Sequence, residues 1–228
     1  RAPEPLHTIN TRFEYQDANW FPDFPASAET VMRLYELAHG ATVDGVIAVN
    51  TQILEGLLDI LGPQIRTRDQ SLIARDTVVA QIYADIQKNK AAGIAPKQLI
   101  ATLGPHLIQQ LTSAAPAEII QLVQLFNTAR NRKDILVYAK DESAEKELRA
   151  LAWDGAIDQD HRQDYLMAVH TNIGGGKTDA LMQQKIVERI DIQADGYARK
   201  QVTITRTHTG EPGTHPTNRD YLRVYVPK

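Results

Sequence analysis

The segment with the clearest potential for chemistry spans residues 172–179 and reads Asn-Ile-Gly-Gly-Gly-Lys-Thr-Asp. Three successive glycines allow the backbone to adopt positive φ angles and to approach another group closely. Lys177 follows the glycines, and then come Thr178 and Asp179, residue types that are common at helix caps and turns. The apolar run 165–170 before the glycines predicts a strand. Loops that bind phosphate use the same order of strand, glycine loop and Lys-Thr pair.

The match to a phosphate-binding loop is incomplete, because that pattern needs a glycine five residues before Gly176 and Thr171 stands there. Nucleotide binding therefore stays an alternative to a tight, purely structural turn after the strand. We predict the structural turn, with Lys177 bound to a nearby carboxylate or carbonyl. The candidate ligand-binding residues of the chain are Arg12, Asp17, Asn172, Gly174, Gly175, Gly176 and Lys177.

The sequence contains no motif for a metal site and no residue for thiol catalysis. The seven histidines are scattered, and none has the spacing of a zinc motif, although His208 and His215 share one predicted loop. The chain has no cysteine, which excludes thiol catalysis, disulfides and cysteine-ligated metals. We therefore predict no metal and no cofactor, and the sequence identifies no catalytic residue.

Carboxylates near arginines would be needed for a magnesium–phosphate site. The carboxylates at predicted loop or strand ends are Asp17, Asp23, Asp44 and Asp179, and the candidate arginines are Arg12, Arg66 and Arg68. Sequence spacing does not bring these groups together, and helix caps or salt bridges are the simpler interpretation of the carboxylates.

The elements that must position these residues have an α/β pattern, with a mixed sheet flanked by helices. A helix that Ser27 can cap is expected to run to about His39. A strand over Val43–Val49 and a helix through Leu61, capped by Asn50 or Thr51, are expected to follow. The strand is almost unbroken in its apolar character, so we predict that it lies in the centre of the mixed sheet with helices on both sides. Gly62 and Pro63 end the second helix.

The rest of the chain divides into a helical middle and a strand-rich end. Helices are expected over 76–88, 96–111 and 116–129, and their apolar residues are interpreted as core or, alternatively, as a groove for an apolar chain. Later residues alternate with period two, which predicts C-terminal antiparallel strands. We expect a single domain over 1–228, with an α/β part (1–70), a helical part (71–132) and a strand-rich part (133–228).

Composition narrows the class of protein. With 228 residues, 43% hydrophobic and 23% charged, the chain can build a core. Its net charge of −3 gives no bulk signal for nucleic acid. No apolar run is long enough to cross a bilayer, and the absence of cysteine is compatible with an extracytoplasmic bacterial protein. The chain starts at Arg1 without methionine, so a processed or truncated product is expected.

Several segments together resemble a bacterial family known as domain-of-unknown-function family 4012. They are residues 17–29, 43–50, 57–63, 172–179 and 220–227. Members of that family look like envelope proteins with an N-terminal transmembrane helix, so the resemblance implies an extracytoplasmic location and a membrane-anchored precursor. An upstream strand-bearing motif of the family is absent here, so an edge of the sheet is expected to be covered by the missing N-terminal segment of the precursor or by a second copy.

A more remote similarity, to the LytR-CpsA-Psr phosphotransferases, rests on the order of helix, Val43–Val49 strand, helix and Leu-Gly-Pro. It implies a possible cell-wall glycan or polyprenyl lipid as ligand, but no catalytic residue carries over. We therefore expect a cell-envelope or extracellular domain with a binding or assembly role. The alternatives are a glycan phosphotransferase-like protein that binds a polyprenyl-linked substrate and, third, a cytoplasmic nucleotide-binding protein.

Overall fold

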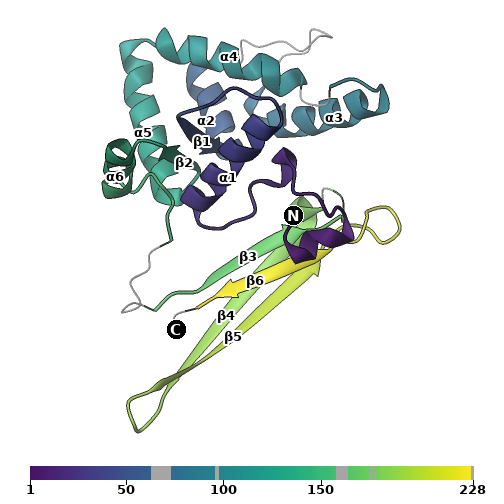
Figure 1. The fold of residues 1–228 in the computed structure, drawn as a ribbon, viewed down its shortest axis with the longest axis vertical. Helices are drawn as coiled ribbons and strands as arrows, with labels where there is room; N and C mark the ends of the chain where they lie inside the picture. The colour runs from purple at the N-terminus through teal and green to yellow at the C-terminus, as the bar shows by residue number, and fades with distance from the viewer. Residues whose placement is uncertain (63–72, 96–97, 158–163, 175, 177, 227–228) are drawn as a thin grey trace. The chain divides into compact units, whose positions relative to one another are not determined.

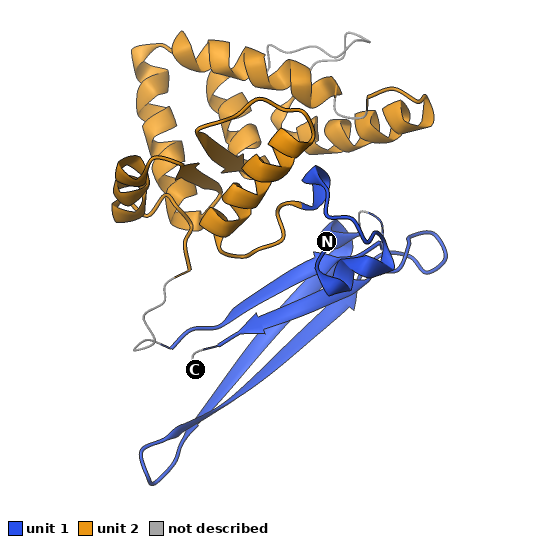
Figure 2. Cartoon of the chain, in the orientation of Figure 1, with its two compact units in different colours: residues 1–17, 158–228 blue, residues 18–157 orange. Residues whose placement is uncertain are grey.

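The computed structural model describes residues 1–62, 73–95, 98–157, 164–174, 176 and 178–226. The chain forms two compact units (Figure 2). Unit 1 consists of residues 1–17 and 158–228, and unit 2 consists of residues 18–157. Unit 1 is thus discontinuous in sequence, and these units cut across the three-part division expected from the sequence. The mixed α/β class is confirmed.

Unit 2 is mostly helical (Figure 1). Its elements are α1 (Phe24–Leu37), β1 (Gly45–Val49), α2 (Thr51–Leu61), the short 3₁₀ helix η3 (Arg75–Thr77), α3 (Val78–Ala91), α4 (Gln98–Thr112), α5 (Pro116–Arg132), β2 (Ile135–Ala139) and α6 (Glu142–Ala150). The predicted order of helix, strand and helix, followed by three middle helices, is confirmed.

Side-chain caps set the starts of two of these helices. The Asp23 carboxylate accepts a hydrogen bond from the Ala26 amide at 3.4 Å, so α1 begins at Phe24 and is capped by Asp23 and not by the predicted Ser27. The Ser27 hydroxyl instead donates to the Phe21 carbonyl at 2.7 Å. Asn50 caps α2, as predicted, because its side-chain oxygen accepts from the two amides that begin the helix.

The core of unit 2 is built by apolar faces of its helices. Its buried residues are Ile53, Leu57, Leu58, Leu61, Ile73, Val78, Leu99, Leu103, Leu107, Leu122, Ala129 and Ile135. The apolar positions predicted for the middle helices therefore do pack as core at Leu99, Leu103, Leu107 and Leu122. Others of the predicted set, including Ile119 and Val123, are exposed.

The position predicted for the Val43–Val49 strand is wrong. Among the described residues, β1 pairs only with β2, in an antiparallel two-stranded sheet, and does not lie in the centre of a mixed sheet. The side chain of Ile47 is 68% exposed and that of Val49 is 59% exposed. An unbroken apolar run shows that a strand suits an apolar environment, but it does not determine how many neighbours the strand has.

Unit 1 is built from strands and short 3₁₀ helices. Its elements are η1 (Glu4–Thr8), η2 (Tyr15–Asp17), β3 (Met167–Asn172), η4 (Asp179–Leu181), β4 (Met182–Ile192), β5 (Ala198–His208) and β6 (Asp220–Tyr225). Strands β4 and β5 form an antiparallel hairpin, and β3 pairs antiparallel with β6. The predicted C-terminal antiparallel strands are confirmed, and Gly196 has a positive φ of 86° in the predicted hairpin turn.

Candidate functional site

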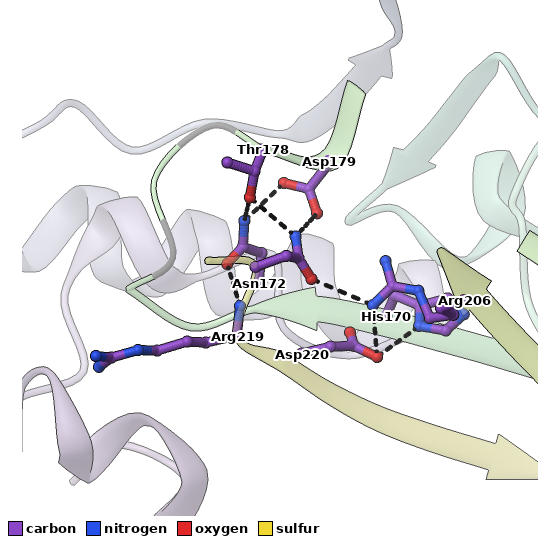
Figure 3. Close-up of polar contacts among 8 residues, drawn as sticks. His170, Asn172, Thr178, Asp179, Arg206, Arg219 and Asp220 are labelled. Carbon is purple, nitrogen blue, oxygen red and sulfur yellow. Dashed lines mark hydrogen bonds and ion pairs between the residues drawn. The ribbon is translucent and has the colours of Figure 1, made fainter. Parts of the chain in front are cut away.

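The side chain of Asn172, the last residue of β3, holds the glycine loop together (Figure 3). Its amide nitrogen lies 2.9 Å from the Gly176 carbonyl, 3.3 Å from the Thr178 hydroxyl and 3.1 Å from the Asp179 carboxylate. Its side-chain oxygen accepts from the Arg219 backbone amide at 3.3 Å. Since an amide group has only two hydrogens, the three acceptors share them. Asn172 thus ties both ends of the loop to the start of β6.

The two loop glycines that the structure describes both adopt positive φ angles. Gly174 has φ of 72° and Gly176 has φ of 69°, a region that side chains disfavour. Gly175 and Lys177, also predicted site residues, lie outside the described residues. The anchoring role predicted for Lys177 therefore stays a prediction.

A second amide, that of Asn218, binds the same loop. Its nitrogen donates to the Thr178 hydroxyl at 3.2 Å and to the Asp179 carboxylate at 3.3 Å. Its oxygen accepts from Arg206 of β5 at 3.3 Å. Thr178 is 2% exposed, so the hydroxyl that both amides contact is shielded from water. The loop is therefore fixed by side chains from three strands or strand ends.

An ion cluster lies beside this loop. The Asp220 carboxylate accepts from His170 Nδ1 and from Arg206 Nη1, each at 2.8 Å. All three side chains are only 17–20% exposed. His170 Nε2 is buried and has no partner among the described residues, so this histidine does not present its second nitrogen to a solvent ligand. The geometry indicates a structural cluster that neutralises a carboxylate, rather than a general base.

A surface pocket of about 590 Å³ lies next to the loop, within unit 1. Its lining residues are Glu4, Pro5, Thr8, Ile173, Arg219, Asp220 and Tyr221. This volume falls in the range of small-molecule sites, roughly 300–1,000 Å³. The lining contains one guanidinium, of Arg219, and two carboxylates, of Glu4 and Asp220, and the Arg219 side chain extends away from the Asn172 network in Figure 3. The mixed charge does not single out phosphate as a ligand.

The structure brings some predicted site residues together and leaves others apart. Asn172, Gly174 and Gly176 form the loop described above, and Asp179 joins them. Arg12 makes its described bond through its backbone amide to Asn10, and the Asp17 carboxylate accepts from the Glu14 amide at 3.3 Å. Neither side chain contacts the Asn172 network through a hydrogen bond or ion pair in the described ranges. Arg66 and Arg68 lie outside the described residues.

Sequence reasoning missed four members of the network: His170, Arg206, Asn218 and Asp220. One signal was available, since Arg206 follows Val202 and Ile204 on the same face of a period-two strand. An arginine in an apolar row is mostly buried and needs a carboxylate partner. The partner could not be identified, because Asp220 lies on a different strand and its pairing depends on how the β3–β6 pair packs against the β4–β5 hairpin.

The strands of unit 1 leave apolar side chains in contact with solvent. Ile186, Ile190 and Ile192 share one face of β4 and are 38–76% exposed, and Leu222 and Val224 of β6 fall in the same range. Beside them, the Lys200 ammonium binds Glu188 at 2.9 Å and Asp164 at 3.0 Å. Hydrogen bonds to Glu188 first, and then to Asp164, raise the pKa of Lys200 above its ordinary value. We call the three isoleucines of β4 the unit 1 apolar row.

Comparison with known families gives one match. Residues 2–86 match the model of a family described as "Protein of unknown function (DUF4012)". Comparisons with curated proteins and with solved structures gave no match. None of the helices that the structure describes has both the length and the apolar character needed to cross a bilayer. Within the same ranges, no group of three His, Asp or Glu side chains could hold a metal ion.

Proposed function

We propose a binding or assembly role at the bacterial cell envelope for this protein. Through residues 2–86 the chain belongs to the protein family of unknown function DUF4012. The observation that carries this proposal is the unit 1 apolar row. Large apolar side chains that share one face of a strand are expected to pack inside a core, and yet the side chains of the row are exposed to water. Covering it with another polypeptide is the simplest way to bury it.

The energetic argument rests on burial. Full burial of an isoleucine side chain contributes about 1.5–3 kcal/mol relative to leaving it in water. The three isoleucines of β4 alone therefore favour a partner strongly, and contiguous exposed apolar patches on soluble proteins mark interaction sites. Charged groups border the row, since Lys200 stands directly opposite Ile190 in the hairpin. An apolar centre with a polar rim is the usual composition of a protein interface.

A polypeptide fits this surface better than an anionic membrane does. The hairpin face that carries the three isoleucines also carries charges of both signs, Glu188 and Lys200, and the chain as a whole carries −3. Binding to anionic lipid needs an excess of positive charge near the apolar residues. The partner class that we propose is therefore another protein chain with an apolar surface of its own.

The proposed location is extracytoplasmic, with a membrane-anchored precursor. The family resemblance supports it, and the absence of cysteine is compatible with an oxidising compartment. The phosphotransferase-like alternative, with a polyprenyl-linked glycan as substrate, would need arginines and carboxylates beside an apolar tunnel. The pocket at Arg219 offers one guanidinium with two carboxylates, so the described residues favour the assembly role over this alternative.

Single cysteines in the cysteine-free chain test both the partner and the location. We would introduce Ile190→Cys in the apolar row and, as a matched control, Ala194→Cys in the exposed turn of the same hairpin. Both variants would be treated with a membrane-impermeant maleimide, in intact producing cells and as purified protein. We expect Ala194→Cys to be labelled in both samples, and Ile190→Cys to be labelled only in the purified protein.

Two results would contradict the proposal, each in a different part. Equal labelling of Ile190→Cys in cells and in purified protein would show that no partner covers the apolar row. Labelling of Ala194→Cys only after the cells are broken would place the domain on the cytoplasmic side and would contradict the location.

A further inference from the structure

The outer edge of β1 in unit 2 directs unpaired backbone groups toward solvent. Two hydrogen bonds fix the register of β1 against β2: the Lys140 amide donates to the Asp44 carbonyl at 2.8 Å, and the Asn50 amide donates to the Asp134 carbonyl at 3.0 Å. Because hydrogen-bonded and non-hydrogen-bonded pairs alternate, the even-numbered residues of β1 direct their backbone amides and carbonyls toward β2. The amides and carbonyls of residues 45, 47 and 49 therefore point to the opposite side.

Within the described ranges no segment pairs with this edge, whereas the outer edge of β2 is covered. On β2, the Val137 amide donates to the Trp153 carbonyl and the Ala139 amide donates to the Glu145 carboxylate, each at 2.9 Å. Among the described residues, no hydrogen bond reaches the outward backbone groups of β1. Ile47 and Val49, whose backbone groups point outward, also have the most exposed side chains of the strand.

The edge also lacks the features that usually protect a strand from pairing. Charged residues, prolines and bulges discourage edge-to-edge association. Strands β4 and β5 carry charges of both signs along their length, whereas β1 reads Gly-Val-Ile-Ala-Val and carries none. An uncharged, regular and apolar edge is a site where an added strand can pair through its backbone.

We propose that the outer edge of β1 pairs antiparallel with β1 of a second copy of this chain, about a two-fold axis at Ile47. This proposal rests on the proposed assembly role and names one partner for it. In this register Gly45 of one copy lies opposite Val49 of the other, and Ile47 lies opposite Ile47. Every outward backbone group of residues 45–49 then finds a partner, and a continuous four-stranded sheet forms with strand order β2, β1, β1, β2.

Two features suit an antiparallel pair of two copies: the preformed order of the strand and the charges of its flanking residues. The strand is already ordered by its pairing with β2, so two such edges associate without the entropic cost of ordering a flexible peptide. The antiparallel register also places Asp44 opposite Asn50, whereas a parallel in-register pair would place the two Asp44 carboxylates side by side. Like charges directly opposite each other destabilise a strand pair.

Disulfide formation between single cysteines tests the register. The Ile47→Cys variant would place two cysteines in a directly opposed pair, with a Cα separation of about 5.5 Å, which suits a disulfide. Val49→Cys is the matched control, because it has similar exposure on the same strand but lies opposite Gly45. We expect mild oxidation of the purified chain to give a covalent dimer of Ile47→Cys at least tenfold faster than of Val49→Cys.

The oligomeric state of the unmodified chain is the second measurement. Sedimentation velocity over a dilution series should show a monomer–dimer equilibrium, and Ile47→Lys should shift it to monomer. Ile108→Lys, a change at a similarly exposed isoleucine of α4, should leave this equilibrium unchanged. Equal cross-linking rates of the two cysteine variants, or a monomer at all concentrations, would overturn the proposal.

Failure of the β1 pairing can be distinguished from failure of the proposed assembly role. If Ile47→Cys is protected from maleimide in intact cells but the purified chain stays monomeric, a different strand occupies the edge and the second copy is wrong. If pairing through β1 fails while Ile190→Cys is still protected in cells, the pairing proposal fails and the assembly role stands.

Discussion

At the scale of single residues, the side chain of Asn172 joins β3, the glycine loop and the start of β6. Replacing it with alanine leaves the Thr178 hydroxyl with fewer partners in a buried position and removes the acceptor of the Arg219 amide. Loss of partners for buried polar groups costs about 1–3 kcal/mol. We expect Asn172→Ala to lower the free energy of unfolding of unit 1 by this amount in urea titrations.

The control for this change is Gln201→Ala on the exposed face of β5, which should have little effect. Amide exchange resolves the location of the loss, because Asn172→Ala should accelerate exchange in β3 and β6 and leave α2 and α5 unchanged. An unchanged exchange pattern in β3 would show that the loop does not depend on this side chain.

Backbone conformation gives a second prediction at this scale. Gly176 has φ of 69°, and a Cβ placed there would lie 3.1 Å from the Pro216 ring. Gly176→Val should therefore lower the stability of unit 1, since the left-handed region costs about 1–2 kcal/mol for a side-chain-bearing residue and β-branched residues resist it most. The melting temperature measures this loss.

A glycine without such constraints is the control. Gly104 lies in α4, and a Cβ there meets nothing within 4 Å. Gly104→Ala should therefore raise the melting temperature, because alanine is favoured over glycine inside a helix by about 0.5–1 kcal/mol. If both changes shift the melting temperature in the same direction, the conformational argument at Gly176 is wrong.

The Lys200 cluster predicts a pH dependence. Its carboxylate partners raise the pKa of Lys200 above the ordinary 10.5, so the protonated form is favoured in the folded chain. The stability from this interaction is fully present below the unfolded pKa and is lost as the pH rises through the folded pKa. Lys200→Met should therefore be less stable than the native chain near neutral pH, and the difference should shrink above about pH 10.5. Chemical denaturation at several pH values measures it, and a constant difference would contradict the assignment.

At the scale of elements, the helix caps show what local sequence determines. Asn50 was identified as a possible cap of α2 because an amide or hydroxyl residue stands before an apolar helical pattern, and the structure confirms it. The cap of α1 was placed four residues late, at Ser27, since both Asp23 and Ser27 are good cap residues and only the tertiary contacts of Asp23 decide between them. Local patterns thus locate an element well and its first residue less well.

The cap of α2 leads to a prediction for that element. Asn50→Ala removes the acceptor for the Gln52 and Ile53 amides and should lower the stability of unit 2 by about 0.5–2 kcal/mol. Asn50→Asp keeps the acceptor and should recover most of the loss, which the urea midpoint would report. Equal midpoints for the two variants would show that the cap contributes little.

The sequence predicted well which residues form strands, and predicted poorly which strands pair with each other. Period-two alternation identified β4, β5 and β6 because it depends only on which side chains share a face. The place of β1 in a sheet was wrong, because pairing depends on which distant segments exist to accept it. The same limit hid the His170–Asp220–Arg206 cluster, whose members lie on three different strands.

At the scale of the whole molecule, the two units differ in how they are stabilised. Unit 2 has a core of leucines and isoleucines from four helices and β2, whereas unit 1 relies on hydrogen-bonded hairpins and ion pairs around one loop. Composition predicted a chain able to build a core but could not show that the core would lie almost wholly in one unit. The discontinuity of unit 1 was also beyond sequence patterns, since no composition shift marks residues 17 and 158.

Asp23 gives a prediction at this scale, because it holds both ends of unit 2. One carboxylate oxygen caps α1, and the other accepts from the Ile157 amide at 2.9 Å. Asp23→Ala should cost more than an ordinary cap, about 2 kcal/mol or more, since it removes both contacts. Asp141→Ala, which removes only the α6 cap, is the control and should cost less in the same urea titration.

The closure at Asp23 has a consequence for how the chain acquires its structure during synthesis. Residues 18–157 are complete in the emerging chain before the strands of unit 1 have been made, so unit 2 can fold while the later strands are still inside the ribosome. Once folded, its ends are held together by the Phe24–Gly155 and Asp23–Ile157 bonds. The long intervening chain then no longer separates residues 1–17 from the late strands. The two segments of unit 1 can then meet without closing a long flexible loop, because the entropy of that closure was already lost when unit 2 folded.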